Sequence, residues 1–292
     1  MKSILIQLDT DTHPSSFDRV VAVDAGVEHL FSYGAVNNDN VTGLVHGAMF
    51  TRGPADLKNT AIFVGGSNVA DGEKLLQQVT STFFGPMRVS VMMDSNGCNT
   101  TAAAAVVAAR QHLDLSCTSA VVLGGTGPVG QRVAQLLADE GSQVTVVSRS
   151  QQRALATCNT IRSRTQRGEL TTAGATTEPE FAALCQNKQL VVAAGATGVC
   201  FLPTGTLAAC DDLQVAIDLN AVPPTGIADI NAGDRAKEQH GVLCYGALGV
   251  GGTKMKVHKQ AIQRLFESSD AVFDTAEIYQ LALDVAGLNK PA

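Results

Sequence analysis

A glycine-rich segment follows a short apolar run near the middle of the chain. Residues 120–124 lead into the run Gly125–Gly130, which matches the pattern G-x-G-x-x-G. In this pattern the first glycine allows a tight turn, the second lets the backbone approach a pyrophosphate, and the third lets helix and strand pack closely. A helix N-terminus then offers unpaired N–H groups and its positive dipole end. Because a strand is expected before the run and a helix after it, we predict a dinucleotide site rather than an ordinary glycine-rich turn.

The residues about 20 positions further on indicate which dinucleotide is bound. An NAD-binding loop carries an Asp or Glu there for the ribose hydroxyls. Here the apolar run 144–147 ends in Ser148, Arg149 and Ser150. A carboxylate would repel a 2′-phosphate, whereas Arg149 can bind one through charge-assisted hydrogen bonds. The sequence therefore favours NADP, with NAD possible, although Arg149 is also compatible with a simple surface turn.

Two further loops belong to the same expected rim. Residues 194–198 follow one apolar run, and residues 218–224 follow another. Ligands of open parallel sheets lie outside the carboxyl ends of the strands, so these loops are expected to flank the nicotinamide. Their glycines are equally typical of ordinary turns. The candidate cofactor-binding residues are Gly125, Thr126, Gly127, Pro128, Val129, Gly130, Ser148, Arg149, Ala194, Gly195, Ala196 and Asn220.

Several segments together resemble the bacterial NADP-dependent methylene-tetrahydromethanopterin dehydrogenases. The most specific are Asp94-Ser95-Asn96-Gly97 with residues 99–104, and the stretch from Gly246 to His258. Segments 8–18, 60–66, 125–130 and 265–269 match as well, so the resemblance runs nearly end to end. It implies an α/β protein with a Rossmann-type doubly wound parallel sheet and an N-terminal α/β substrate domain. It also implies an active site in the cleft between these domains, and a homo-oligomer, trimeric or hexameric.

The resemblance implies a reaction too. A hydride passes from the methylene carbon of methylene-tetrahydromethanopterin to C4 of NADP in one-carbon (formaldehyde) metabolism, and a methenyl cation remains. That cation is delocalised over N–C–N, so no metal and no obligatory proton transfer are needed. The protein must bring two ring systems together and exclude water. We therefore expect no bound metal and no acid–base pair.

Two polar loops are the expected binding sites of this pterin substrate. A pterin ring displays amide-like donors and acceptors, which side chains of these types can match. Each residue also has an ordinary structural interpretation: Asp94 or Ser95 as a helix cap, and His13 as a turn residue beside Pro14. The candidate substrate-binding residues are Asp9, Asp11, His13, Asp94, Ser95, Asn96, Asn99 and Thr100.

Two lysines follow the glycine-rich stretch near the C-terminus. Lys254 and Lys256 are two positions apart, so on a helix they point in different directions. By the resemblance, Lys256 is the catalytic candidate that orients the pterin, with Lys254 as the alternative. On the residues alone, two surface lysines in a first helical turn explain the pattern equally well.

One position departs from the family pattern, and two other classes of function compete with the resemblance: an enzyme with another substrate and a non-catalytic regulator. Ser150 stands where a second basic residue often follows the arginine, so selectivity for NADP over NAD is expected to be relaxed. A methylene-tetrahydrofolate dehydrogenase, or a shikimate-like NADP oxidoreductase, would use the same architecture. A non-catalytic NADP-binding regulator would keep the phosphate loop, but the polar loops 9–16 and 94–101 argue against it.

The elements that position these residues are recognised from short apolar runs. Strands without polar alternation that alternate with helices indicate a parallel sheet buried on both faces. The segment 17–24 cannot be assigned, and residues 246–252 are expected to be a glycine-rich turn. Strands are expected at 3–8, 61–64, 89–93, 120–123, 143–147, 190–194, 215–217 and 242–245, and helices at 69–83, 102–112, 129–139, 253–266 and 275–286.

The length of 292 residues is enough for two domains. We expect a pterin-binding domain over residues 1–112, completed by a C-terminal helix within 270–292. The Rossmann NADP-binding domain is expected over residues 113–269.

Composition limits the partners and the compartment. The chain has 21 basic and 27 acidic residues, a net charge of −6, and no basic stripe, so no nucleic-acid partner is expected. Arg162, Arg164 and Arg167 are more typical of a solvated helix end. The seven cysteines are scattered without CxxC spacing, which favours a reducing compartment. No apolar run is long enough for a signal peptide or a membrane span, so we expect a cytoplasmic protein.

Overall fold

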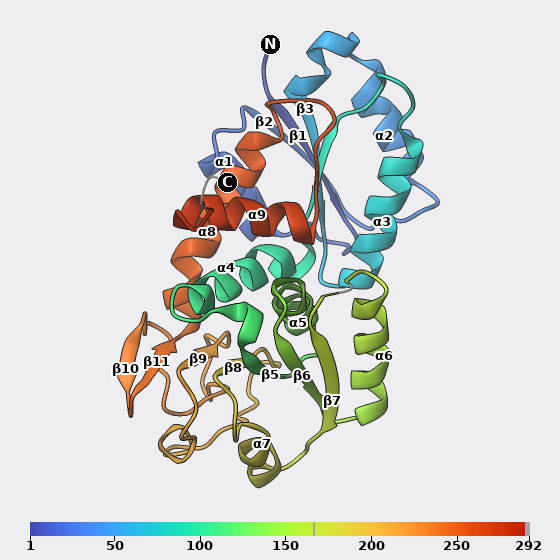
Figure 1. Cartoon of the computed structure of the whole chain (residues 1–292). Coiled ribbons are helices and arrows are strands. Elements are labelled where there is room, and N and C mark those ends of the chain that lie inside the picture. The colour runs from blue at the N-terminus through green and yellow to red at the C-terminus, as the bar shows by residue number, and fades with distance from the viewer. Residues whose placement is uncertain (166, 290–292) are drawn as a thin grey trace. The chain divides into compact units, whose positions relative to one another are not determined.

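The computed structural model describes residues 1–165 and 167–289 (Figure 1). The chain separates into two units, the first formed by Met1–Thr100 with Met255–Ala292 and the second by Thr101–Lys254. The domain boundaries expected from the sequence fell at residues 112 and 269. Residues 290–292, the end of the C-terminal segment expected to complete the first domain, lie outside the described residues.

Within the described residues, the first unit contains a parallel five-stranded sheet in the order β12-β4-β3-β1-β2. β1 pairs with β3 from Ile4 opposite Thr60 to Asp9 opposite Gly65. β12 pairs with β4, Val272 opposite Val91, so a segment from the end of the chain supplies an edge strand. The strands are β1 (Ile4–Asp9), β2 (His29–Tyr33), β3 (Thr60–Gly65), β4 (Ser90–Met93) and β12 (Val272–Phe273).

The helices of the first unit start at recognisable caps. The Asn68 side chain accepts hydrogen bonds from the backbone N–H of Ala70 and Asp71 at the start of α3. Asp274 and Glu277 form a capping box at the start of α9. Apolar side chains of α2 and α3 pack on those of β1, β3 and β4 to form a buried core. The helices are α1 (Ser16–Asp24), α2 (Val41–Phe50), η1 (Pro54–Asn59), α3 (Val69–Thr82), η2 (Ser95–Gly97) and α9 (Thr275–Ala286).

In the part of the chain that the structure describes, the second unit contains a seven-stranded sheet in the order β10-β11-β9-β8-β5-β6-β7. From β5 the chain adds β6 and β7 on one side, then returns to add β8, β9 and β11 on the other. The sheet is parallel except for β10, which pairs antiparallel with β11. The strands are β5 (Ser119–Leu123), β6 (Gln143–Ser148), β7 (Glu169–Gly174), β8 (Leu190–Ala193), β9 (Val215–Asp218), β10 (Lys237–Gln239) and β11 (Val242–Tyr245).

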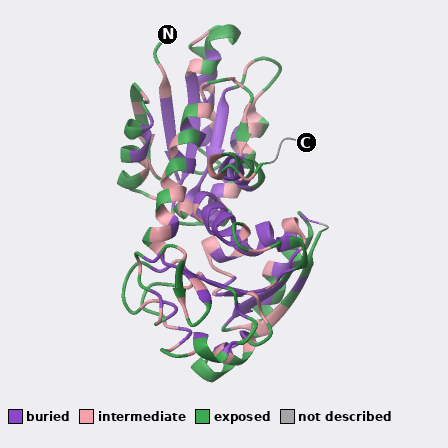
Figure 2. Ribbon diagram, turned by 60° about the vertical axis from the view of Figure 1, so that its left-hand side comes forward, coloured by how far each residue is buried: buried purple, intermediate pink, exposed green. Residues whose placement is uncertain are grey.

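This strand order is the doubly wound arrangement, and it confirms the α/β, Rossmann-type fold class. β5, β8 and β9 are buried over nearly their whole length. In the first unit, Figure 2 shows the strands of the sheet mainly in purple, the colour of buried residues. Among the described residues, the helices that lie wholly within the second unit are η3 (Leu115–Cys117), α5 (Pro128–Glu140), α6 (Gln151–Arg162), α7 (Glu178–Leu184) and η4 (Leu207–Ala209). Two helices continue across a unit boundary, α4 (Cys98–Arg110) and α8 (Ala247–Arg264).

The structure differs from the sequence expectation at the start of α8. Residues 247–252 form the first turns of this helix instead of a turn before it. A Cβ atom at Gly246 would lie 2.1 Å from the Asn231 carbonyl oxygen, and one at Gly249 would lie 1.9 Å from the Asp234 carbonyl oxygen. These glycines therefore let the helix start pack against the backbone of residues 231–234. Close approach, not left-handed backbone, explains this part of the glycine-rich pattern.

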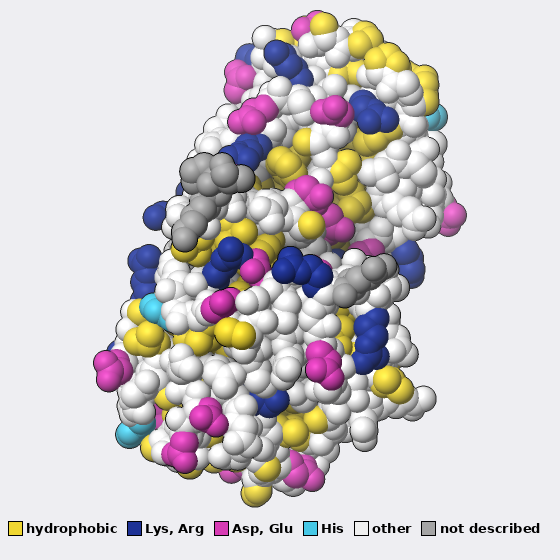
Figure 3. Space-filling view, in the orientation of Figure 1, with side chains coloured by type: hydrophobic (Ala, Val, Ile, Leu, Met, Phe, Trp, Pro, Cys, Tyr) yellow, Lys and Arg dark blue, Asp and Glu magenta, His cyan; other side chains and the backbone are white. Residues whose placement is uncertain are grey.

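No helix among residues 1–165 and 167–289 combines the length and apolar content needed to cross a membrane. On the face shown in Figure 3, basic and acidic side chains are interspersed.

The cysteines behave mainly as small apolar residues. All seven are free, and Cys98, Cys158, Cys185, Cys210 and Cys244 are buried. Burial raises the pKa of the Cys185 thiol to about 12 and that of Cys244 to about 11. Both thiols therefore stay protonated and unreactive near neutral pH.

Candidate active site

The phosphate loop joins β5 to α5 at the carboxyl edge of the second sheet. Gly124 has φ +71°, and the Gly125 N–H donates to the Val147 carbonyl at 2.9 Å, which ties the loop to β6. Gly127 is the N-cap of α5 and has extended backbone, and Pro128 is the first helical residue. The N-terminus of α5 thus opens at the point where β5 and β8 diverge.

The glycines of this loop serve different purposes. A Cβ at Gly130 would lie 2.5 Å from the Gly124 carbonyl oxygen, and one at Gly125 would lie 2.8 Å from Val146 Cγ1. The packing of the protein itself therefore requires both. At Gly127 a Cβ would lie 3.3 and 3.4 Å from the carbonyl oxygens of Gly124 and Ala194, which is a tight contact but less severe than at the other two glycines. Since packing constrains Gly127 less than Gly125 and Gly130, its missing side chain leaves room for a ligand, and the loop fits the pyrophosphate of a dinucleotide.

The loop after β8 lies directly against the phosphate loop. A Cβ at Gly124 would be 2.7 Å from Gly195 Cα, and the Ala194 N–H donates to the Leu123 carbonyl at 2.8 Å. Ala194 and Gly195 are partly exposed, and Ala196 is exposed. Three of the expected cofactor-binding residues thus lie at the point where the strand order reverses, where open α/β sheets bind their ligands.

The end of β6 carries the residues expected to select the dinucleotide. Ser148 is buried, and its hydroxyl lies 3.3 Å from the Thr126 hydroxyl of the phosphate loop. Arg149 is exposed and makes no hydrogen bond or ion pair with any residue of the described ranges. Ser150 is the N-cap of α6 and accepts from the Arg153 N–H. The Arg149 guanidinium is therefore available to an incoming phosphate.

The loop after β9 is organised by a buried carboxylate that the sequence did not single out. Asp218 accepts from the backbone N–H of Asn220 at 3.0 Å and of Ile227 at 2.9 Å. Burial raises the pKa of Asp218, and these N–H groups oppose that shift. The Asn220 amide donates to the Pro224 carbonyl, and its oxygen accepts from the Val222 N–H. Asn220 therefore holds the shape of the loop with both ends of its side chain.

In the first unit the strand order reverses between β1 and β3, and the loop after β1 lies there. Asp9 is buried, and its oxygens accept from the backbone N–H of Asp11 and Ser15 at 2.9 and 3.0 Å. Asp11 accepts from the N–H and hydroxyl of Ser67, which follows β3. His13 is exposed. Asp9 and Asp11 thus fix the two loops, and His13 remains accessible.

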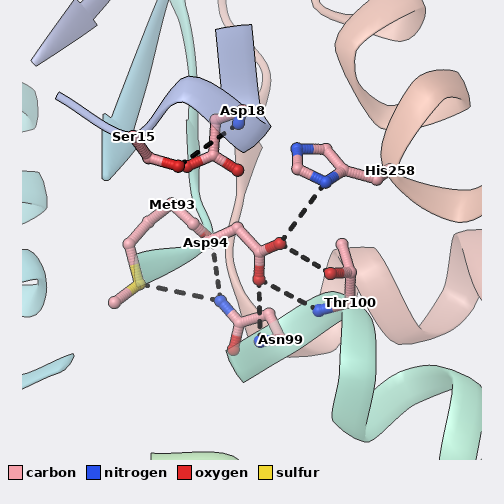
Figure 4. A network of polar contacts seen from close by, with 7 residues as sticks. All are labelled: Ser15, Asp18, Met93, Asp94, Asn99, Thr100 and His258. Carbon is pink, nitrogen blue, oxygen red and sulfur yellow. Dashed lines mark hydrogen bonds and ion pairs between the residues drawn. The ribbon is translucent and has the colours of Figure 1, made fainter. Parts of the chain in front are cut away.

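Asp94 is the centre of a second polar network, at the end of β4 (Figure 4). The Asp94 carboxylate is fully buried and accepts from the N–H of Asn99 at 2.9 Å and of Thr100 at 3.0 Å. The Thr100 hydroxyl donates to it as well, at 2.6 Å. This carboxylate caps the N-terminus of α4, where its negative charge interacts favourably with the positive end of the helix dipole.

His258, on α8, faces the same carboxylate. Its Nδ1 lies 3.9 Å from Asp94 Oδ2, and both side chains are fully buried. The imidazole stacks on Phe63 with ring centroids 5.7 Å apart and planes at 15°. His258 lies in the stretch from Gly246 to His258 that carries the family resemblance, but the sequence alone predicts no role for it. Its helical spacing from the apolar residues Ala261, Ile262 and Leu265, which are buried, is the signal that could have found it.

The other predicted substrate-binding residues of this loop, Ser95, Asn96 and Asn99, differ in their exposure to solvent. Asn99 is buried, donates to the Met93 carbonyl and to Asp274, and accepts from the Thr275 hydroxyl, so it links α4 to α9. Ser95 is buried and donates to the Gly65 carbonyl. Asn96 is exposed with φ 55°, and it is the polar side chain that this loop presents to solvent.

The two lysines lie on α8 with different exposure. Lys254 is partly exposed and takes part in an interaction, whereas Lys256 is exposed. Lys254 is the last residue of the second unit, and Lys256 belongs to the first unit. The helix confirms that the two side chains point in different directions.

Comparisons with known proteins match the first unit to a family model and nearly the whole chain to two relatives. The model of a family described as methylene-tetrahydromethanopterin dehydrogenase, N-terminal, matches residues 16–96. A protein of Methylorubrum extorquens named bifunctional protein MdtA is 44% identical over 98% of this chain and 99% of its own. The NAD(P)-dependent methylenetetrahydromethanopterin dehydrogenase of the same organism is 32% identical, again over 98% and 99%.

Among solved structures, the shikimate 5-dehydrogenase of Listeria monocytogenes, in complex with shikimate and NAD, has a TM-score of 0.58. The match covers 96% of each chain at 13% identity, so the likeness is one of fold alone.

The different demands on the loop glycines can be tested with two variants. Gly127→Ala is expected to weaken NADP binding about tenfold while the melting temperature changes little, because the methyl group enters ligand space. Gly130→Ala is expected to cost about 1–3 kcal/mol of unfolding free energy through overpacking. Calorimetric titration with NADP and thermal unfolding of both variants measure this. Wild-type NADP affinity in Gly127→Ala would contradict the assignment of the pyrophosphate.

Proposed function

The chain belongs to the family of methylene-tetrahydromethanopterin dehydrogenases, and on that premise we propose its reaction. It is an NAD(P)-dependent oxidoreductase that transfers a hydride from methylene-tetrahydromethanopterin to NADP and leaves methenyl-tetrahydromethanopterin. The observation that carries this function is likeness to a named dehydrogenase over nearly the full chain, joined to a phosphate loop placed at the reversal of the strand order.

The residues of the chain have modest tasks in this reaction. When bound, the dinucleotide supplies the ring carbon that accepts the hydride. Loss of hydride from the methylene carbon leaves a cation shared between the two neighbouring nitrogens, so no protein group has to stabilise a localised charge. The hydride carries both electrons of the C–H bond, so no proton passes to a side chain. The protein contributes binding, orientation and exclusion of water.

We propose that the second unit binds the cofactor through the phosphate loop and the ends of β6, β8 and β9. Gly127 leaves room for the pyrophosphate, and the N-terminus of α5 favours its charge. The exposed Arg149 binds the 2′-phosphate of NADP. Ser150 lacks the second positive charge that would strengthen this preference, which fits a cofactor described as NAD(P) in the relative.

The candidate substrate-binding residues fall into two groups, those exposed to solvent and those whose polar atoms are used within the protein. We propose that the exposed His13 and Asn96 contact the pterin directly. Asp9 and Asp11 position the loop after β1. The loop after β4 is held by hydrogen bonds within the protein, some inside the turn and some to β3 and the start of α9, and these bonds hold Asn96 in place. They are made by Asp94, Ser95, Asn99 and Thr100. This assignment gives the buried residues an indirect role in substrate binding.

We propose that Lys256 orients the pterin, because its ammonium group is exposed whereas Lys254 is already engaged within the protein. The positive charge of Lys256 would not stabilise the methenyl cation that forms during the reaction. The proposed role of Lys256 is therefore to bind polar groups of the substrate rather than to transfer a proton.

We also propose a homo-oligomer, trimeric or hexameric, in the cytoplasm. Phe31 and Tyr33 on the edge strand β2, and Val20 and Val23 on α1, are exposed apolar side chains of the kind found in subunit contacts. The free cysteines favour a reducing compartment. Light scattering gives the mass in solution, and a monomer at micromolar concentration would contradict the oligomer.

The reaction is tested by absorbance assays of the purified chain with methylene-tetrahydromethanopterin and methylene-tetrahydrofolate, each with NADP and NAD. We expect methenyl formation to be fastest with the methanopterin substrate and NADP, because the family acts on that pterin. Turnover of the folate alone would assign the chain to a different substrate. Measurable NADP binding without turnover of either pterin would leave the fold unchanged and refute the function.

Arg149→Ala tests the assignment of the 2′-phosphate. A hydrogen bond to a charged group contributes about 1.5–3 kcal/mol, so the KM for NADP should rise about tenfold or more while that for NAD stays within about twofold. Arg88→Ala, which removes an exposed arginine from the first unit, is the control and should change neither KM. Equal losses with both cofactors would mean that Arg149 does not distinguish them.

The two lysines are compared in the same assay. Lys256→Ala should lower kcat/KM for the pterin about tenfold, since one charge-assisted contact is lost, while KM for NADP is unchanged. Lys254→Ala should have a smaller effect on the pterin. The reverse order would show that Lys254 is the residue that faces the substrate.

A further inference from the structure

A fully buried histidine lies inside the first unit. His258 has an exposure of 0%, and of the six histidines, all within the described residues, it alone is buried. A buried polar side chain is costly unless it has partners, so a histidine in this position points to a specific role. The proposed reaction leaves the imidazole unused, because no proton passes to the protein. The contacts of His258 therefore have to indicate its role.

His258 links α8 to three other elements of the first unit. Its Nδ1 lies 3.9 Å from Oδ2 of Asp94, at the end of β4. Its ring stacks on Phe63 of β3, with centroids 5.7 Å apart. Phe17 of α1 lies on the ring as well, with centroids 6.4 Å apart and planes at 39°. One imidazole thus contacts residues of α1, β3 and the end of β4.

The Asp94 carboxylate connects this histidine to the loop after β4. Figure 4 shows the imidazole and the Thr100 hydroxyl directed at the same carboxylate oxygen, Oδ2. The other oxygen accepts from the N–H groups of Asn99 and Thr100. The Gly97 N–H donates to the Asp94 carbonyl at 2.8 Å, which closes a tight turn around Asn96. A displacement of Asp94 would therefore move the turn that presents Asn96 to solvent.

The same imidazole specifies the rotation of α8 about its axis. Residues two positions apart on a helix are separated by about 200°, so Lys256 and His258 lie on nearly opposite sides. Lys256 is accordingly exposed, whereas His258 is buried. Val257 and Ala261 are also buried, but apolar packing is non-directional. A contact with one carboxylate oxygen specifies a single position of the helix, and with it the direction of Lys256.

The three residues proposed to contact the pterin are thus carried by elements that meet at one imidazole. His13 precedes α1, Asn96 follows β4, and Lys256 lies on α8. We propose that His258 is a positioning residue for the pterin. Its contact with Asp94 holds Lys256 and Asn96 in a fixed arrangement, so that both can bind the same substrate molecule. This inference rests on the proposed function, and it gives the imidazole no chemical step.

His258→Phe tests the contact with the carboxylate, because phenylalanine keeps a flat ring against Phe63 and removes both nitrogens. Since the change weakens binding of the pterin, KM for the pterin should rise about fivefold or more while kcat changes less. The Kd for NADP, which the second unit binds, should stay within about twofold. His46→Phe is the matched control. His46 lies on α2 with its ring 5.1 Å from that of Phe50, and the substitution should change neither value.

Combining His258→Phe with Lys256→Ala distinguishes a positioning role from a purely structural one. The effects of two residues that act independently add, whereas the effects of residues that act together do not. If His258 orients Lys256, the lysine contributes less once the imidazole is gone. We expect Lys256→Ala to lower kcat/KM for the pterin about tenfold in the wild type and less than about threefold in His258→Phe. Additive losses would overturn the proposal.

Asp94→Asn removes the same contact from the other side, and it replaces His258→Phe if that variant does not fold. Asparagine keeps an oxygen for the N–H groups of Asn99 and Thr100 but removes the charge that faces the imidazole. It should raise KM for the pterin and reduce the contribution of Lys256 in the same way. A wild-type KM in both folded variants would refute the positioning role.

Hydrogen exchange gives a readout that needs no pterin. In His258→Phe and Asp94→Asn, the backbone amides of residues 96–100 and 255–262 should exchange faster than in the wild type, because the link between them is lost. The amides of the phosphate loop, residues 125–130, should exchange as before. Wild-type exchange in both variants would contradict the link. Faster exchange in a chain that turns over no pterin would support the link and refute the proposed function.

Discussion

Close backbone contact around the Gly124 carbonyl is the constraint on which the nucleotide-binding unit depends. A Cβ at Gly130 would lie 2.5 Å from this oxygen, and a Cβ at Gly124 itself would lie 2.7 Å from Gly195 Cα. The start of α5 and the loop after β8 can therefore approach the end of β5 this closely only because residues 124 and 130 are glycines. This contact brings the N-terminus of α5 to the point where the strand order reverses, between β5 and β8.

Buried aspartates organise the loops of both units in the same way. Asp9, Asp94 and Asp218 lie at the ends of β1, β4 and β9, and each accepts backbone N–H groups from the segment that follows. A buried carboxylate is costly unless several donors satisfy it, so each aspartate specifies one loop conformation. The side chains that remain accessible, such as His13, Asn96 and Val222, are held by these loops without taking part in the networks.

The sequence predicted the elements with continuous apolar runs and missed those with mixed composition. β5, β8 and β9 were recognised because both faces are buried. β2 and β7 were missed because exposed and buried positions are mixed along an edge strand. Residues 246–252 were mistaken for a turn, since the close contacts of Gly246 and Gly249 with residues 231–234 exist only in the folded chain. Side-chain roles were the hardest to predict, because the spacing of Asp94 does not show that its carboxylate is buried.

The pairing of β12 with β4 has a consequence for the order in which the chain can fold. The second unit is one uninterrupted segment, Thr101–Lys254, whereas the first needs Val272 and Phe273 to complete its sheet. During synthesis from the N-terminus, β4 keeps an unpaired edge until nearly the whole chain has left the ribosome. The interval is long, because translation adds about 5–20 residues per second. The nucleotide-binding unit can therefore be finished first, and the first unit is the part of the nascent chain that is exposed to aggregation and to chaperones.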